Sequence, residues 1–314
     1  MRSPLLFLVF NRPEPTARVF EAIRAAKPAR LYVAADGPRA GRAGEAERCA
    51  ATRDVATAVD WDCKVQTLFR AENLGCKQAV SRAIDWFFEQ EEEGIVLEDD
   101  CVPVPSFFRF CDELLERYRA DPRVALISGD NFQFGRRYGP ASYYFTRYAH
   151  IWGWAGWRRT WSHYDRDATA WPAFRDGGGL QRLFGSRSAE IQHWRAVLDK
   201  LYEGKIDTWD HQLNLAIWKQ GMMSIVPQCN LIRNIGFGEG ATHTTGESKF
   251  ADMATGEMEF PLQHPAELET CAAADDNTAD QMFVRPLMGR VLGKVKSLFK
   301  RLSSRRAHAE RAAM

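Results

Sequence analysis

Apolar residues in the first 130 positions form short runs that alternate with longer stretches of helical periodicity. The predicted strands are Leu5–Phe10, Leu31–Ala35, Val65–Phe69, Ile95–Leu97 and Val124–Ile127. The predicted helices are Pro15–Lys27, Gly41–Val59, Lys77–Glu93 and Pro105–Arg119. Strands that are apolar on both faces are typical of a sheet that is buried on both sides. The pattern therefore predicts an α/β fold with a mostly parallel central sheet and helices on both faces.

Polar residues follow each of the first four predicted strands. Sheets of this kind bind ligands beyond the carboxyl ends of their strands, so these residues are candidates for a site. They are Asn11-Arg12-Pro13, Asp36-Gly37-Pro38, Arg70-Ala71-Glu72-Asn73 and Glu98-Asp99-Asp100.

The second half of the chain is less regular. Eight of the ten tryptophans fall between positions 152 and 218, and helices are predicted for Ser188–Glu203 and Trp209–Gln220. We expect the main body of the chain to divide into two halves, residues 1–130 and 131–245. Residues 246–285 are expected to form an irregular arm or lid, and 286–314 a basic amphipathic tail.

Composition and charge exclude several classes of protein. Apolar residues make up 45% and charged residues 26% of the chain, as in ordinary globular proteins. The six-residue run at Leu5–Phe10 is far shorter than the ~20 residues of a membrane span. Seven cysteines without a Cys-x-x-Cys pair favour a reducing cytoplasm. Residues 285–314 have a net charge of +8 and residues 1–284 one of −7, and so acidic a body argues against a nucleic-acid partner.

The segment Ile95–Asp100 is an apolar strand that runs directly into three carboxylates. Adjacent acidic side chains repel one another unless water or a cation neutralises them. Oxygen ligands of this kind suit Mn²⁺ or Mg²⁺, which commonly hold substrate phosphates. The alternative is a solvated acidic turn before Pro103.

A second candidate cluster lies at Ile235–Thr244. Its glycines permit close approach of the backbone to a ligand, and His243 could complete a metal shell. The alternative is an ordinary glycine-rich surface loop with a solvated histidine.

The motifs resemble those of a GT-A-fold glycosyltransferase that uses a nucleotide-sugar donor. Those of the first half are Phe10-Asn11-Arg12-Pro13, Ala34-Ala35-Asp36-Gly37-Pro38-Arg39, Asn73-Leu74-Gly75 and Leu97-Glu98-Asp99-Asp100. The Glu-Asp-Asp triplet is similar to that of the N-acetylglucosaminyltransferase I type. The chain resembles still more closely a bacterial group of uncharacterised nucleotide-diphospho-sugar transferases. The motifs that carry this likeness are Ser128–Phe132, His150–Arg159, Asp207–Gln212, Asn234–Gly238 and Ala241–Thr244.

The resemblance, over residues 4–245, implies a GT-A catalytic domain with a nucleotide-sugar-binding half in 1–130 and an acceptor-side half in 131–245. It also implies roles for individual positions. Asp36 matches the acid that contacts the nucleoside, and Asp100 matches the direct metal ligand, with His243 as a later ligand of the metal or the diphosphate. Further contacts to the donor or to metal-bound water are implied for Asn11, Arg12, Arg70, Asn73, Glu98 and Asp99.

An inverting transfer needs a carboxylate that takes the proton of the acceptor hydroxyl. Asp207 and Asp210 are the candidates at the head of the predicted helix Trp209–Gln220, where aspartate also serves as a cap. We expect Asp207 to cap this helix and Asp210 to act as the base. Asp130 is a weaker rival, expected instead to shape the donor sugar site.

Tryptophan faces bind sugar rings, so Trp152, Trp154 and Trp157 could form an acceptor platform, although packing in the core is the plainer interpretation. Arg158 and Arg159 are expected either to bind phosphate or to face solvent. The tail combines an apolar stripe with basic residues, which suits an anionic membrane surface at the inner face of the cell membrane or docking on the acidic body.

The function expected is metal-dependent transfer of a sugar, with a UDP-sugar as the favoured donor, to a glycan, a lipid-linked glycan or a protein. Two alternatives stay open. A sugar-1-phosphate nucleotidyltransferase has a similar sheet but would require a glycine-rich basic loop where Asn11–Pro15 stands. A carbohydrate-binding module would keep the tryptophans but would not need Glu98–Asp100 or Asp210.

Overall fold

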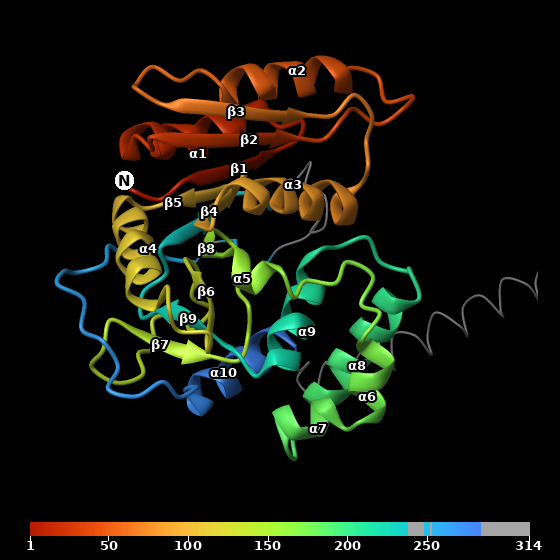
Figure 1. Cartoon of the computed structure of the whole chain (residues 1–314), viewed down its shortest axis with the longest axis vertical. Helices are drawn as coiled ribbons and strands as arrows, with labels where there is room; N and C mark the ends of the chain where they lie inside the picture. The colour runs from red at the N-terminus through yellow and green to blue at the C-terminus, as the bar shows by residue number, and fades with distance from the viewer. Residues whose placement is uncertain (238–247, 252, 284–314) are drawn as a thin grey trace, which may run out of the picture.

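The computed structural model describes residues 1–237, 248–251 and 253–283. Within these residues the central sheet has eight strands (Figure 1). In sheet order they are β3 (Lys64–Phe69), β2 (Arg30–Ala35), β1 (Leu5–Val9), β4 (Glu93–Glu98), β8 (Trp154–Trp157), β6 (Val124–Ser128), β9 (Met223–Pro227) and β7 (Tyr143–Thr146). The five strands predicted from the first 130 residues are all present.

The sheet is mostly parallel. Strands β1 to β4 run in one direction, β8 is antiparallel to both β4 and β6, and β9 runs parallel to β6. The carboxyl ends of β1, β2, β3, β4, β6 and β9 therefore share one edge of the sheet, which spans both predicted halves of the chain. Strand β1 lies between β2 and β4, so the strand order reverses at β1. α/β sheets bind ligands at such points.

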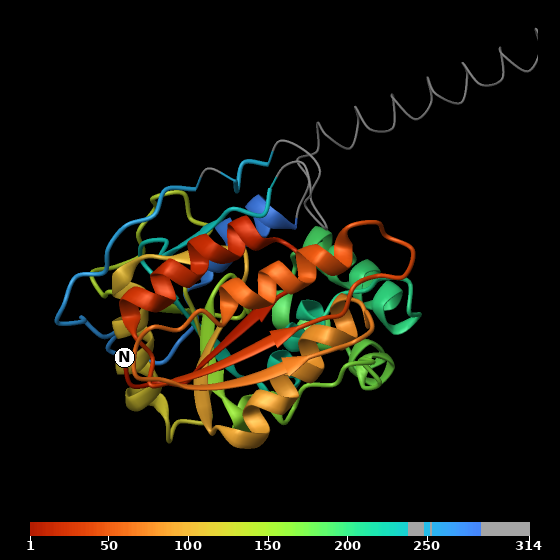
Figure 2. The same ribbon diagram turned by 90° about the horizontal axis from the view of Figure 1, so that it is seen from above.

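Helices cover both faces of the sheet, which confirms the predicted fold class. One core packs against α1 (Pro13–Ala26), α2 (Glu45–Ala56) and α4 (Pro105–Tyr118). The opposite core packs against α3 (Cys76–Gln90), α5 (Arg158–Trp161), α6 (Trp171–Asp176), α7 (Gly179–Phe184), α8 (Ser188–Tyr202) and α9 (Asp210–Gln220). Seen from above, α1 and α2 lie on one side of β1–β3 and α3 on the other (Figure 2).

A small second sheet brings a later segment of the chain beside the acidic triplet. Strand β10 (Ile232–Asn234) pairs antiparallel with β5 (Cys101–Pro103), and Asn234 lies opposite Cys101. The Ile235 N–H continues the contact by donating to the Asp100 carbonyl at 2.8 Å. The beginning of the glycine-rich segment, far away in sequence, is thereby placed beside the triplet.

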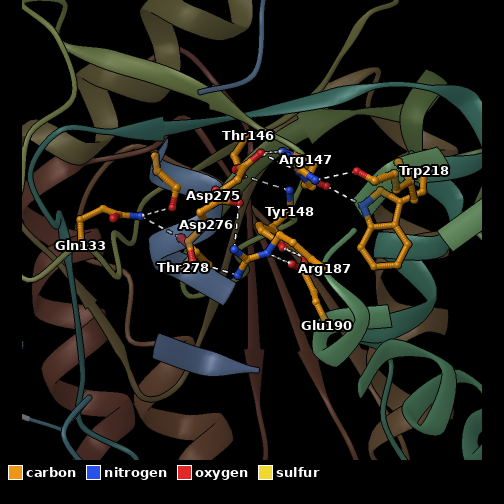
Figure 3. A network of polar contacts seen from close by, with 12 residues as sticks. Gln133, Thr146, Arg147, Tyr148, Arg187, Glu190, Trp218, Asp275, Asp276 and Thr278 are labelled. Carbon is orange, nitrogen blue, oxygen red and sulfur yellow. Dashed lines mark hydrogen bonds and ion pairs between the residues drawn. The ribbon is translucent and has the colours of Figure 1, made fainter. Parts of the chain in front are cut away.

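The region expected as an irregular arm ends in a helix, α10 (Ala272–Met282). A buried polar network fixes it to the body (Figure 3). Asp275 accepts hydrogen bonds from Thr146 and Arg147, and Gln133 Nε2 donates to Thr278 at 2.8 Å. Helix α10 was not predicted because its apolar periodicity is weak. Polar contacts rather than an apolar stripe hold it in place.

No helix among the described residues is long and apolar enough to cross a membrane.

Candidate functional site

The acidic triplet meets Arg12 where the ends of β1 and β4 lie side by side. Arg12 Nη2 forms ion pairs with Asp99 and with Asp100, the latter at 3.0 Å. Asp99 Oδ2 also accepts the Phe10 N–H at 3.3 Å. The protein thus supplies a cation of its own to two of the three carboxylates.

Glu98 has no such partner. Its Oε1 is buried and accepts no hydrogen bond from the described residues. Burial raises the pKa of Glu98 from 4.5 to about 8, and the charges of Asp100 and Asp99 add to the rise, whereas Arg12 opposes it. Burial also raises the pKa of Asp99, to about 6, with Arg12 again opposing. Keeping all three carboxylates ionised beside a single guanidinium is therefore costly.

Asp100 lies against the segment that follows β10. A Cβ at position 236 would lie 2.1 Å from Asp100 Oδ2, so any larger residue there would displace the Asp100 carboxylate. The described residues contain no group of three or more His, Cys, Asp or Glu side chains that could hold a metal. They do contain two neighbouring carboxylates, Glu98 and Asp100, and Mg²⁺-type ions are often bound by one or two carboxylates plus substrate phosphates. The donor set fits an open site of that kind. The other predicted ligand, His243, lies outside the described residues.

Asp36 holds the turn before α3. Its carboxylate accepts Asn73 Nδ2 at 2.9 Å and the backbone N–H groups of Leu74 and Gly75 at 3.0 and 3.2 Å. Burial raises the pKa of Asp36, and these hydrogen bonds work against the rise. The structure thus brings Asp36 and Asn73 together, and their predicted contacts with a nucleoside stay predictions.

Arg70 follows β3 and lies within electrostatic reach of Asp36. Burial lowers the pKa of the Arg70 guanidinium, and Asp36 works in the opposite direction. Its Nη2 is buried and has no hydrogen-bond partner within the described ranges. Arg53 Nη2 ties the two segments together by donating to the carbonyls of Asp36 and Arg70 at 3.1 and 2.7 Å.

Glu45 is a site residue that the sequence did not reveal. It is the first residue of α2 and is fully buried. Its carboxylate accepts Asn11 Nδ2 at 2.9 Å and the Arg39 N–H at 2.6 Å, and hydrogen bonds from the Arg39 side chain lower its pKa to about 2. Glu45 therefore positions Asn11 at the end of β1. A lone glutamate in a helical stretch gave no signal for this role.

Asp207 caps a different helix from the one expected. Its two carboxylate oxygens accept the N–H groups of Cys76 and Lys77 at 3.0 and 2.9 Å, at the start of α3. The N-cap residue Gly75 has no side chain to do this, and a Cβ there would lie 2.7 Å from Asp207 Oδ2. The predicted capping of helix Trp209–Gln220 is thus wrong, because Asp207 joins the two halves of the chain instead.

Asp210 is the first residue of α9 and lies within electrostatic range of Glu98. Its charge adds to the rise in the pKa of Glu98, which places the two carboxylates near each other. Thr208 Oγ1 donates to Asp210 Oδ1, and His211 Nδ1 lies 3.5 Å from Oδ2. About 30% of the Asp210 side chain is exposed, so a substrate can reach it.

Asp130 follows β6 and is fully buried. Its Oδ1 accepts the Trp152 N–H at 3.2 Å, and its Oδ2 has no partner among the described residues. Burial raises the pKa of Asp130 well above its ordinary range. This carboxylate lies on the same edge of the sheet as the triplet.

The tryptophan platform is only partly present. Trp154 and Trp157 are each 3% exposed and belong to the core, in line with the plainer interpretation. Trp152 alone is half-buried, in ring contact with Phe132 and Phe237.

Arg158 is exposed and Arg159 half-buried, and both donate hydrogen bonds to backbone carbonyls. Arg158 Nε donates to the carbonyls of Phe88 and Glu91, and Arg159 Nη1 donates to that of Val124 at 2.9 Å. Both arginines therefore tie the end of β8 to neighbouring elements.

No protein-family model matches the chain, and no curated protein matches it in sequence. Solved structures do resemble it. The galactosyltransferase LgtC with donor and acceptor sugar analogues aligns over 92% of this chain and 99% of its own, at 11% identity and a TM-score of 0.38. An apo UDP-glucose pyrophosphorylase aligns over 73% and 90%, at 10% identity and a TM-score of 0.37. Mouse xyloside xylosyltransferase 1, in its apo form, aligns over 69% and 81%, at 11% identity and a TM-score of 0.32. The function proposed below rests on the residues of the site.

Proposed function

We propose that the chain is a GT-A-type glycosyltransferase that moves a sugar from a nucleotide diphosphate to an acceptor. The observation that carries this proposal is the cluster of Arg12 with the acidic triplet in one half of the chain, with Asp210 of the other half within electrostatic range of Glu98. This cluster lies where the strand order reverses, beyond the carboxyl ends of β1 and β4. This arrangement offers charged groups to a diphosphate and a separate carboxylate to an acceptor.

Glu98 and Asp100 are the residues proposed to hold Mn²⁺ or Mg²⁺. When bound, the cation would neutralise the charge that develops on the departing nucleoside diphosphate. The orphaned oxygen of Glu98 supports this assignment, because a buried carboxylate without a partner is costly to keep ionised. Arg12 holds Asp99 and Asp100 in place and remains a second positive charge beside the diphosphate.

Asp210 is proposed as the base that accepts the proton of the acceptor hydroxyl in an inverting transfer. The hydrogen bond from Thr208 engages Oδ1, and the acceptor hydroxyl is proposed to approach Oδ2. His211 Nδ1 lies 3.5 Å from this same oxygen.

Donor binding tests the proposal most simply. A ligand that binds only the folded protein raises its melting temperature, by an amount that follows from the ligand concentration and Kd. We expect one of the common nucleoside diphosphates or nucleotide sugars to do so, more strongly with Mn²⁺ than with chelator. Asp100→Ala should abolish the Mn²⁺-dependent part, whereas Asp54→Ala, at an exposed carboxylate on α2, should retain it. Equal shifts for Asp100→Ala and the parent chain would overturn the metal assignment.

A further inference from the structure

A cavity of about 280 Å³ lies on the same edge of the sheet as the proposed donor site. It is bounded by the segment after β6 and the segment after β9, and by residues 253–256. Because β4, β6 and β9 run in one direction, their carboxyl ends share this edge. We name the cavity the amide pocket, since Asn131, Gln228 and Asn230 line it. Sites for drug-sized ligands occupy roughly 300–1,000 Å³, so this one suits a single ring.

The polar walls of the amide pocket are held rigidly. Gln228 clamps Tyr138, accepting its N–H at 2.9 Å and donating to its carbonyl at 2.6 Å. Asn230 Oδ1 accepts the N–H groups of Asn131 and Ile232, both at 3.3 Å. The Asn230 amide group is therefore fixed, yet its Nδ2 is buried and has no acceptor among the described residues. A buried amide donor without a protein acceptor is a group that a ligand or an ordered water would satisfy.

Phe134 forms an apolar wall in an unusual backbone conformation. It has φ +52° and precedes Gly135 at φ +86°, and bulky residues rarely adopt the left-handed region. The side chain nevertheless remains 46% exposed at the cavity, so burial of the ring does not explain the strain. Backbone strain of this kind collects at ligand sites, where surrounding structure enforces it. Arg137, also exposed and lining the cavity, forms no ion pair with the described residues.

Ring contacts connect Phe134 with the proposed reaction site. Phe134 contacts Phe250, Phe250 contacts Trp152, and Trp152 contacts Phe237, with centroid separations of 5.8, 6.5 and 5.7 Å. Phe237 directly follows Gly236, which lies against Asp100. An extended ligand could therefore reach from the amide pocket toward the acidic triplet along an aromatic surface.

We propose that the amide pocket binds one sugar ring of the acceptor, a pyranose whose apolar face packs on Phe134 and whose hydroxyls bond Asn230 and Arg137. An exposed aromatic face beside fixed amide groups is the combination that a sugar ring, apolar on one face and polar at its edge, requires. The assignment of this ring to the acceptor rests on the proposed function. The binding of a sugar ring to the amide pocket is independent of the proposed function.

Saturation-transfer NMR on the full chain tests the proposal without donor or turnover. The probes are the methyl glycosides of glucose, galactose, mannose, N-acetylglucosamine and glucuronic acid. We expect at least one to bind the parent chain, and Phe134→Gly to raise its Kd at least tenfold. Glycine accepts the positive φ, so this variant should keep the parent melting temperature. Phe134→Trp should restore binding, because it returns an aromatic face.

Tyr202→Ala is the matched control, because Tyr202 on α8 is 50% exposed and lies outside the pocket. It should change Kd by less than twofold. Binding of none of the five glycosides, an unchanged Kd in Phe134→Gly, or an equal loss in Tyr202→Ala would overturn the proposal. If a glycoside binds at Phe134 but no nucleotide binds the chain, the proposed function fails and the sugar pocket stands. If a nucleotide binds but no glycoside does, the sugar pocket fails and the proposed function stands.

Discussion

Glu98, Asp99 and Asp100 are neighbours in sequence but meet different partners. Asp99 and Asp100 share Arg12, while Glu98 is half-buried beside them and its buried Oε1 is unpaired among the described residues. The free energy of ionising a carboxylate depends on such surroundings, so adjacent acids in one turn acquire different pKa values. Glu98 is therefore the member of the triplet that a divalent cation would affect most.

Glu98→Gln should flatten the dependence of stability on pH in the absence of divalent cations. The folded pKa of about 8 lies above the unfolded value near 4.5, so the folded state binds more protons between these pH values. The contribution of Glu98 to the free energy of unfolding is then greatest below pH 4.5 and falls as the pH rises toward 8. Melting temperatures measured in chelator across the range from about pH 5 to 9 should show this loss in the parent chain and less of it in Glu98→Gln. Glu92→Gln, at an exposed neighbour, should follow the parent curve, and a Glu98→Gln curve parallel to it would contradict the burial argument.

At the scale of elements, the start of α3 and the loop before α9 are joined by a single carboxylate. Asp207 accepts two N–H groups at the start of α3. The first N–H groups of a helix have no partner within the helix itself. Because α3 belongs to the first half and Asp207 to the second, this contact fixes Asp210 relative to the triplet.

Asp207→Ala should lower the free energy of unfolding by about 0.5–2 kcal/mol, the range measured for lost helix caps. Urea denaturation followed by circular dichroism would measure it. Glu89→Ala, at the far end of the same helix, is the control and should cost nothing, since an acidic residue there opposes the helix dipole. A stability equal to that of the parent would mean that water replaces the Asp207 carboxylate.

The α10 network should contribute more to stability than the other ion pairs of this helix. The Asp275 side chain is 1% exposed, and its Oδ2 lies 2.8 Å from Arg147 Nε (Figure 3). Removing one partner of a buried pair costs about 3–5 kcal/mol, because the other charge stays buried. Asp275→Ala should therefore lower the free energy of unfolding by about 3 kcal/mol in denaturant melts. Asp276→Ala, which breaks a pair whose carboxylate is 49% exposed, should cost at most about 1 kcal/mol. Similar losses of unfolding free energy in Asp275→Ala and Asp276→Ala would contradict the argument that burial makes the Asp275 pair more stabilising.

Across the whole molecule, local periodicity in the sequence predicted five of the eight strands of the central sheet and the edge where their carboxyl ends lie, but not β7, β8 and β9. Apolar runs marked five strands and placed Arg12, Asp36 and the triplet at their carboxyl ends, where the structure has them. These features depend on a few consecutive residues, and a buried strand needs no distant partner to be recognised.

Contacts between residues that are far apart in the chain could not be predicted from the sequence. The residue pair Asp207 and Lys77 is separated by 130 positions, and Gln133 holds α10 across more than 140. Glu45 and Asn11 likewise meet only after β1 and α2 pack. The position of β8 between β4 and β6, which explains why Trp154 and Trp157 are buried, is likewise an order that periodicity does not encode.

The basic tail, residues 286–314, lies outside the described residues, and its membrane contact stays a prediction from charge and apolar pattern. Each basic residue near an anionic surface contributes about 1 kcal/mol. The full chain should sediment with anionic vesicles, less so as salt rises, and a chain lacking 286–314 should remain in solution. Neutral vesicles are the control. Equal sedimentation of both chains would favour docking of the tail on the body.

The central claim is that this site transfers a sugar from a nucleotide donor with Asp210 as the base. The most direct test is release of nucleoside diphosphate from nucleotide sugars, with Mn²⁺ and a panel of glycan acceptors, by the parent chain, Asp210→Asn and the surface control Asp54→Asn. The account predicts release by the parent and by Asp54→Asn. In Asp210→Asn it predicts unchanged donor affinity and turnover lower by about 10²–10⁴. Parental turnover in Asp210→Asn, or no release by the parent from any nucleotide sugar, would contradict it.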